Sequence, residues 1–187
     1  MGRPPGGAGV ITLCVNISNY TETSRQAKIA EIREVPRRPD LTPVFTAYVD
    51  VGNVLDLGVA AGVHRRVVPI LGGTVTGPRL TAEILPGGAD WQVVRPNGTL
   101  EVVARYTLRA SDGTLISVVN KGLRRGPPEV LGRLAAGEAV PASEYYFRAS
   151  PVFEVADGPH GWLAENVFVA TGERLARQVV IRVYAVG

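Results

Sequence analysis

Hydrophobic and polar residues alternate along most of the chain after residue 41, which is the pattern of half-buried β-strands. The clearest run is TLEVVARYTLRA at 99–110. Because successive side chains of a strand point to opposite faces, one face of this run collects the apolar and aromatic residues Leu100, Val102, Ala104, Tyr106 and Leu108. That face is expected to line a core or a lumen, and the opposite face is expected to meet water.

Similar runs follow one another to the end of the chain, at 43–51, 65–73, 79–87, 89–96, 114–122, 144–155, 162–172 and 176–186. Asn97-Gly98 and Asp112-Gly113 separate consecutive runs, and both dipeptides favour the tight turns of β-hairpins. One helix is predicted after Pro127-Pro128, ending at Gly137. About eight or nine antiparallel strands predict an all-β domain, either a closed barrel or a sandwich. Closure is favoured because it removes exposed strand edges.

The first forty residues have a different character. They begin with the loop-like MGRPPGGAG, continue through a segment that could form a short helix capped at Thr21 or Thr23, and end in a charged, proline-interrupted stretch at 33–40. We expect residues 1–40 to form an N-terminal arm that is flexible or packs in an oligomer, unless they reflect an upstream start. The barrel domain is expected to span 41–187.

Composition narrows the class of protein. The 187 residues are 45% hydrophobic and 20% charged, as in one ordinary soluble domain. The net charge of +3 comes almost entirely from unclustered arginines, so nucleic-acid binding is not expected. The apolar segment 9–17 is too short to cross a bilayer and lacks the flanks of a signal peptide. We therefore expect a cytoplasmic protein with no membrane partner.

Few residues could hold a metal. Cys14 is the only cysteine, which excludes an intrachain disulfide and a cysteine-based metal site. His64 and His160 have no ligand partner at helical or hairpin spacing. The glycines of LGGTVTGP at 71–78 precede a predicted strand and are followed by no Gly-Lys-Ser/Thr, so we interpret them as a bulge or turn and not as a phosphate loop. Neither a metal nor another cofactor is expected.

The stretch LPGGADWQ at 85–92 places a carboxylate and an amide beside a predicted bend. In the strand that follows, Asp90 and Gln92 share one face and Trp91 takes the other. A buried Asp90 could serve as an acid or base, although acids at strand ends more often cap turns or pair with arginine. Arg105 and Arg148 are strand arginines that would clasp a carboxylate if they pointed inward, whereas a surface position is the commoner case.

Several strings, among them RRVVPILGGTVTGPRL, AEILPGGADWQVVRPNGTLEVVARYTLRASDG, EYYFRASPVFE and WLAENVFVATGER, closely resemble domain-of-unknown-function family 3237 over about residues 43–186. The resemblance implies a single antiparallel β-barrel similar in plan to allene-oxide-cyclase and lipocalin-like barrels. Some of those barrels bind apolar substrates and steer cyclisations or isomerisations. The residues on the family's recurring polar and aromatic positions are Asp90, Trp91, Gln92, Arg105, Tyr106, Tyr146, Arg148 and Trp162. Ala164 departs from the family pattern, where an asparagine is usual.

The expected function is a barrel that encloses a small apolar organic molecule and acts on it as a cofactor-free cyclase or isomerase by confinement. Asp90 would be the acid or base, and Tyr106 and Arg148 would polarise a carbonyl. Trp91, Gln92, Arg105, Tyr146 and Trp162 would contact the ligand. A non-catalytic carrier barrel and a structural oligomer with a filled barrel are the alternatives. We also expect the protein to form a homo-oligomer, foremost a dimer. An open cavity that contains Asp90 and an arginine would favour the enzyme, and an all-apolar cavity would favour the carrier.

Overall fold

A computed structural model describes residues 38–187. The predictions for the N-terminal arm fall outside the described residues, apart from residues 38–40. The first described strand begins at Leu41, and Asp40 and Gly187 exchange two backbone hydrogen bonds, which hold both ends of the described domain together. Along residues 38–187 there is no helix with the length and apolar character needed to cross a membrane.

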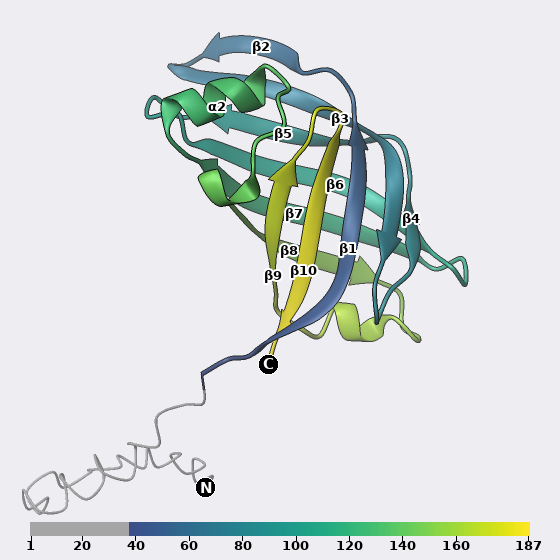
Figure 1. The fold of residues 1–187 in the computed structure, drawn as a ribbon. Helices are drawn as coiled ribbons and strands as arrows, with labels where there is room; N and C mark the ends of the chain where they lie inside the picture. Colours follow the sequence, from purple (N-terminus) through teal and green to yellow (C-terminus); the bar gives the residue numbers. More distant parts are fainter. Residues whose placement is uncertain (1–37) are drawn as a thin grey trace, which may run out of the picture. The chain divides into compact units, whose positions relative to one another are not determined.

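The described residues form ten strands, one α-helix and two 3₁₀ turns (Figure 1). The strands are β1 (Leu41–Val51), β2 (Leu55–Ala60), β3 (Val63–Thr76), β4 (Ala82–Ile84), β5 (Gly88–Val94), β6 (Leu100–Ala110), β7 (Leu115–Arg125), β8 (Tyr146–Val155), β9 (Phe168–Arg174) and β10 (Gln178–Val186). The helix is α2 (Pro128–Ala135), and the 3₁₀ turns are η2 (Ala142–Glu144) and η3 (Gly161–Leu163). The predicted helix is confirmed, with a proline in its first turn.

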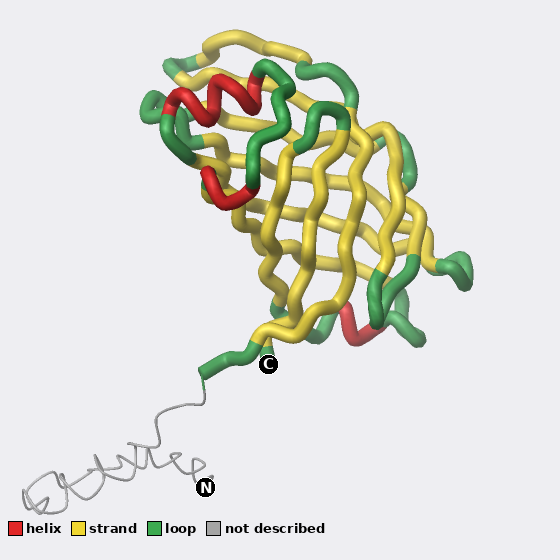
Figure 2. The backbone as a smooth tube through the Cα atoms, in the orientation of Figure 1, coloured by secondary structure: helices red, strands yellow, loops and turns green. Residues whose placement is uncertain are grey.

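The sheet closes on itself, and every pairing in it is antiparallel. The closed circuit runs β1, β10, β9, β8, β7, β6, β5 and β3, and β3 returns to β1. β2 is an additional strand on β3, and β4 pairs with both β3 and β6. Figure 2 shows the strands wrapping around a common interior, with α2 at one end. The predicted closed antiparallel barrel is confirmed.

Two segments differ from the predicted strands for local reasons. The run 79–87 yields only β4, because the chain bends at Pro86-Gly87, where Gly87 has a φ of +103° that L-residues rarely adopt. The run 162–172 begins with η3, and its strand β9 starts only at Phe168. β2 was not predicted, because all its residues are exposed and no buried face imposes a period of two.

The glycines at 72 and 73 lie inside β3 and shape the barrel wall. Gly73 has a φ of +140°, and a Cβ there would overlap the carbonyl oxygen of Tyr48 on β1. The register of β1 against β3 shifts at this point. The bulge interpretation of 71–78 is therefore confirmed, because glycine is needed where two strand backbones approach closely.

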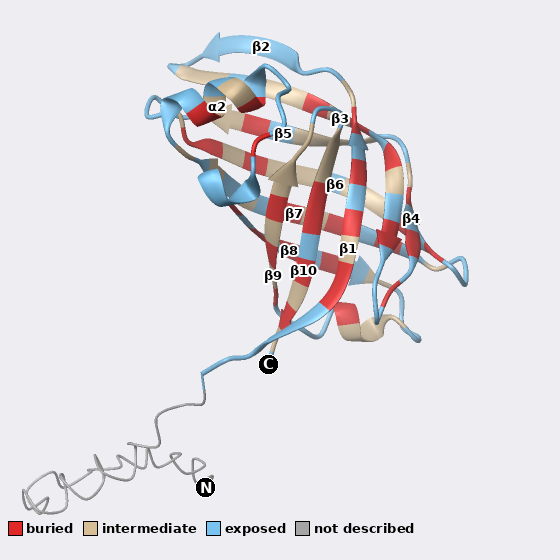
Figure 3. Ribbon diagram, viewed as in Figure 1, coloured by how far each residue is buried: buried red, intermediate tan, exposed pale blue. Residues whose placement is uncertain are grey.

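Aromatic side chains fill the barrel interior at the end near η3. The ring of Phe153 meets those of Phe45 and Phe168 edge to face, at centroid distances of 5.9 Å and 5.0 Å. Trp162 packs against Phe168 in the same way, at 6.0 Å. Buried residues alternate with exposed ones along β1 and β8, as expected for strands with one face in a core (Figure 3). This end of the lumen is a packed core.

Candidate functional site

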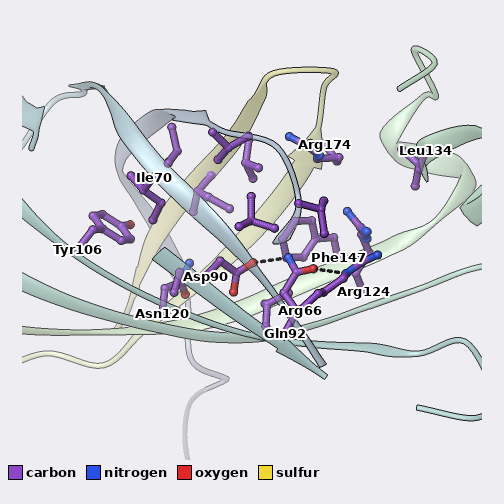
Figure 4. Close-up of a pocket in the computed structure, with 18 of the residues that line it drawn as sticks. Arg66, Ile70, Asp90, Gln92, Tyr106, Asn120, Arg124, Leu134, Phe147 and Arg174 are labelled. Carbon is purple, nitrogen blue, oxygen red and sulfur yellow. Dashed lines mark hydrogen bonds between the residues drawn. The ribbon is translucent and has the colours of Figure 1, made fainter. Parts of the chain in front are cut away.

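A cavity of about 130 Å³ occupies the lumen toward the end where α2 lies. Its lining includes Val54, from the connection between β1 and β2, and Leu134 and Ala135 of α2, so these segments surround its mouth. One wall is apolar and consists of Val49, Val51, Val68, Ile70, Val179 and Ile181. The other carries the polar side chains Arg66, Asp90, Gln92, Asn120, Arg124 and Arg174 (Figure 4).

Strand register explains why the polar residues meet. Asp90 of β5 pairs with Ala104 of β6, and Ala104 pairs with Asn120 of β7, so the three lie in one row across the sheet. Because Ala104 is small, it leaves space between the carboxyl group of Asp90 and the amide of Asn120. Arg124 lies four residues after Asn120 on β7, which places it on the same face of the strand.

A chain of hydrogen bonds holds Asp90 in position. Arg66 Nε donates to Gln92 Oε1 at 2.7 Å, and Gln92 Nε2 donates to Asp90 Oδ2 at 2.5 Å (Figure 4). The backbone N–H of Val103 donates to Asp90 Oδ1 at 3.0 Å. Gln92 is 8% exposed, so this amide is an almost buried link between a guanidinium and a carboxyl group.

The surroundings of Asp90 change the pKa of its carboxyl group. Burial raises the pKa of Asp90 above its ordinary value, because the charged form loses its water. The hydrogen bonds from Gln92 and the Val103 N–H oppose this shift, as do the charges of Arg124 and Arg66, and the net direction is upward. A carboxyl group with a raised pKa beside an open cavity can give or take a proton.

The arginines on the polar wall affect one another. Burial lowers the pKa of Arg124 to about 10, and the positive charges of Arg66 and Arg174 contribute to the same shift. All three still carry a positive charge at neutral pH. Arg124 Nε and Asn120 Oδ1 are buried and have no hydrogen-bond partner among the described residues. The polar wall therefore presents both a surplus of positive charge and two unsatisfied polar atoms.

The structure brings three of the sequence-predicted residues to the cavity: Asp90, Gln92 and Tyr106. The predicted alternation is confirmed, since Asp90 and Gln92 point inward while Trp91 is 47% exposed. Tyr106 lies on the inward face of β6, and burial raises the pKa of its hydroxyl group, which stays protonated at neutral pH. No group of three or more His, Cys, Asp or Glu side chains within residues 38–187 is arranged to hold a metal ion.

The other predicted site residues lie away from this cavity. Trp91 and Arg105 line a separate groove on the outer face of β5 and β6. Arg148 and Tyr146 are exposed on β8, where the Arg148 guanidinium lies 5.2 Å from the centre of the Tyr146 ring. Trp162 lies in η3 at the opposite end of the barrel, beneath the guanidinium of Arg79 at 3.8 Å.

Four residues of the polar wall were not predicted: Arg66, Asn120, Arg124 and Arg174. Asn120 had a recognisable signal, because it continues the face of Ile116 and Val118, which are both buried. A polar amide on such a face is uncommon unless it has a partner or a role. No comparable sequence signal marks Arg174, because it follows a weakly alternating stretch at the end of β9.

Comparison with known proteins places the chain among relatives that share its fold and are matched over nearly their whole length. A profile of the family described as "Protein of unknown function (DUF3237)" matches residues 39–186. A UPF0311 protein of Bradyrhizobium diazoefficiens is 42% identical over 147 residues, which cover 79% of this chain and 96% of the relative. The crystal structure of a conserved protein of unknown function from Rhodopseudomonas palustris is 39% identical, covers 80% of this chain and 98% of that one, and has a TM-score of 0.78.

A more distant likeness is to a crystal structure described as an enzyme from Penicillium herquei. It has a TM-score of 0.61 and 17% sequence identity, and the match covers 81% of this chain and 97% of that chain. At this identity the likeness shows a common fold.

Proposed function

The chain belongs to the DUF3237 family, and from that premise we propose that its lumen holds a small organic molecule on which it acts as a cofactor-free isomerase or cyclase. One observation carries the proposal: the partly buried carboxyl group of Asp90 lies at the wall of a cavity that reaches the barrel mouth. Catalytic carboxyl groups are commonly placed in this way, desolvated and held by a network. The distant fold relative described as an enzyme is consistent with catalysis in this barrel, although a shared fold does not transfer a function.

In the proposed reaction Asp90 exchanges a proton with the bound molecule. As a carboxylate, it removes a proton from a carbon next to a carbonyl group and returns the proton to another atom of the same molecule. No atom or electron is gained or lost overall, so the step needs no cofactor. The neutral hydroxyl group of Tyr106 would donate a hydrogen bond to the carbonyl oxygen as charge builds on it. The apolar wall would confine the reactive conformer.

Gln92 would act as a positioning residue. Its amide donates to Asp90 and accepts from Arg66, which fixes the carboxyl group in one orientation. The same contacts keep the guanidinium of Arg66 from pairing directly with Asp90. A direct ion pair would lower the pKa of the carboxyl group and weaken it as a base.

A non-catalytic carrier barrel is the alternative, and a specific observation favours it. Both oxygens of Asp90 already accept hydrogen bonds from the protein, which would suit a purely structural carboxyl group. In a carrier, replacing Asp90 with asparagine would leave the ligand affinity unchanged and would slow no reaction. The predicted homo-oligomer and the predicted cytoplasmic location remain predictions.

Deuterium exchange tests the catalytic proposal without knowledge of the natural substrate. Cyclohexanone has a single ring, which suits the cavity, and protons next to its carbonyl group. We expect the protein to speed incorporation of deuterium from D₂O at those carbons, followed by NMR, and Asp90→Asn to abolish the acceleration. Glu154→Gln, which removes a carboxyl group from the outer groove, is the matched control and should retain it. Equal exchange by wild type and Asp90→Asn, or no acceleration by either, would favour the carrier.

A further inference from the structure

We infer that the molecule in the lumen is a small organic acid, whose carboxylate lies among Arg66, Arg124 and Arg174 and whose hydroxyl group reaches Asn120. This inference names the ligand class of the proposed lumen site and rests on that proposal. It goes beyond the apolar ligand expected from the sequence, because it assigns a charge and a polar group to the molecule and gives each a place.

Charge balance around the cavity carries the first step. Three arginines and one aspartate line it, and none of the three arginines forms an ion pair with another residue of the described chain. On the outer surface, by contrast, Arg182 pairs with Glu173 at 3.1 Å. Partly buried charges without partners are costly. An anion from outside would offset the surplus charge, and the planar guanidinium group suits a carboxylate.

The two buried polar atoms without a hydrogen-bond partner carry the second step and indicate which polar groups the ligand has. Arg124 Nε is a buried donor and requires an acceptor, which a carboxylate oxygen supplies. Asn120 is 5% exposed, and its amide oxygen lacks a donor. A hydroxyl group both donates and accepts, so it satisfies the Asn120 amide in either orientation of its oxygen and nitrogen.

The positions of Asn120 and Arg124 determine how the ligand is oriented in the cavity. Figure 4 shows Asn120 beside Asp90 on one side of the cavity and Arg66, Arg124 and Arg174 on the other. Asn120 and Arg124 are four residues apart on β7, a separation of about 13 Å between Cα atoms at the usual rise of a strand. The arginine side chains shorten this gap. A ligand that satisfies both groups therefore carries its carboxylate and its hydroxyl group at opposite ends.

Volume limits the body between these ends. The cavity of about 130 Å³ is close to the size of the engineered cavity of roughly 150 Å³ that admits benzene in another protein. One six-membered ring fits, and the apolar wall formed by residues such as Val68 and Ile181 would contact its faces. 4-Hydroxybenzoate has this size, with a carboxylate and a hydroxyl group at opposite ends of the ring, and serves as the probe.

Calorimetric titration of the full-length protein near neutral pH tests the inference. We expect 4-hydroxybenzoate to bind more tightly than benzoate, which lacks the hydroxyl group, and more tightly than phenol, which lacks the carboxylate. Inorganic phosphate, which has no apolar body, is not expected to compete. Arg124→Gln should weaken the affinity for 4-hydroxybenzoate at least about tenfold, as expected for loss of a charge-assisted hydrogen bond. The affinity of this variant for phenol should be unchanged. Asn120→Leu should remove the advantage of 4-hydroxybenzoate over benzoate.

Arg125→Gln is the matched control, because it removes the same charge from the next, outward-facing position of β7 and should leave all affinities unchanged. If Arg124→Gln does not fold, judged by circular dichroism, Arg174→Gln replaces it with the same expected loss. Equal affinity for phenol and 4-hydroxybenzoate, unchanged affinity in Arg124→Gln, or no binding of any probe would overturn the organic-acid inference. The deuterium exchange of cyclohexanone involves no anion, so these failures would leave the catalytic proposal standing.

Discussion

Gln92 Nε2 donates a hydrogen bond of 2.5 Å to Asp90 Oδ2, two residues before it on the same strand. Because strand side chains alternate, both groups point into the lumen while Trp91 between them faces outward. The other end of the same amide accepts a hydrogen bond from Arg66. A single buried amide thus separates a carboxyl group from a guanidinium group and orients both.

The raised pKa of Asp90 predicts a distinctive pH dependence of stability. The folded state favours the protonated form, so the stability that Asp90 contributes is present below its ordinary pKa of 3.8 and is lost as pH rises through the raised value. Asp90→Asn stays neutral and escapes this loss. The free energy of unfolding of the variant should therefore rise relative to wild type as pH increases above the ordinary pKa of 3.8, measured by urea denaturation.

Asp56→Asn provides a control of opposite sign. The Gly58 backbone N–H, and then His64, hold the pKa of the exposed Asp56 below its ordinary value. Its stabilising contribution is present above pH 3.8 and is lost as pH falls through the lowered value. Asp56→Asn should therefore lose stability relative to wild type as pH rises from acid. If the two variants showed the same trend, the environment assigned to Asp90 would be wrong.

Filling the cavity should abolish ligand binding. Ala104 lies between Asp90 and Asn120 in the strand register, so Ala104→Phe places a ring in the space proposed for the ligand. We expect no binding of 4-hydroxybenzoate by calorimetry, with a loss of at most about 3 kcal/mol in the free energy of unfolding. Val103→Phe, on the outward face of the same strand, should bind as wild type does. Unchanged binding by Ala104→Phe would place the ligand outside the lumen.

The aromatic cluster at the other end of the barrel should behave as a core. Phe168 is 1% exposed and contacts both Phe153 and Trp162 edge to face. Phe168→Ala is expected to cost about 3–5 kcal/mol in the free energy of unfolding. Val167→Ala, at a neighbouring position that is 67% exposed, should stay within about 0.5 kcal/mol of wild type. Similar denaturation midpoints for the two variants would contradict a filled lumen at this end.

Gly88 should tolerate no side chain. A Cβ at this position would lie 2.6 Å from the carbonyl oxygen of Arg105 and 2.7 Å from the Cβ of Tyr106 on β6. Gly88→Ala must therefore push apart the paired strands β5 and β6, and we expect a loss of at least about 2 kcal/mol in the free energy of unfolding. In Gly161→Ala the added Cβ meets no atom within 4 Å, so this control should have nearly the stability of wild type when both variants are unfolded in urea.

The sequence predicts the barrel well because its strands carry a strong period of two. Residues 99–110 show this, since the face assigned from alternation holds Leu100, Val102 and Leu108, all buried. The Asn97-Gly98 and Asp112-Gly113 turns have glycines with positive φ, as their hairpin chemistry requires. β2 was not predicted from the pattern, because neither of its faces is buried.

The sequence predicts residues of the site only where they lie on the same strand. Asp90 and Gln92 share a face of β5, and this follows from their spacing alone. The arginines come from β3, β7 and β9, and only strand register brings them to one cavity. Without knowledge of which strands are neighbours, Arg66 and Arg124 look like surface residues. Arg105 and Arg148 are strand arginines on positions of the family resemblance, yet their strand positions turn them outward.

A crystal structure of the protein with 4-hydroxybenzoate tests the lumen site most directly. We predict electron density for the ring in the cavity, with the carboxylate within hydrogen-bond distance of Arg124 and the hydroxyl group within hydrogen-bond distance of Asn120. Density only in the outer groove beside Trp91 and Arg105, or an empty lumen at saturating ligand, would contradict it.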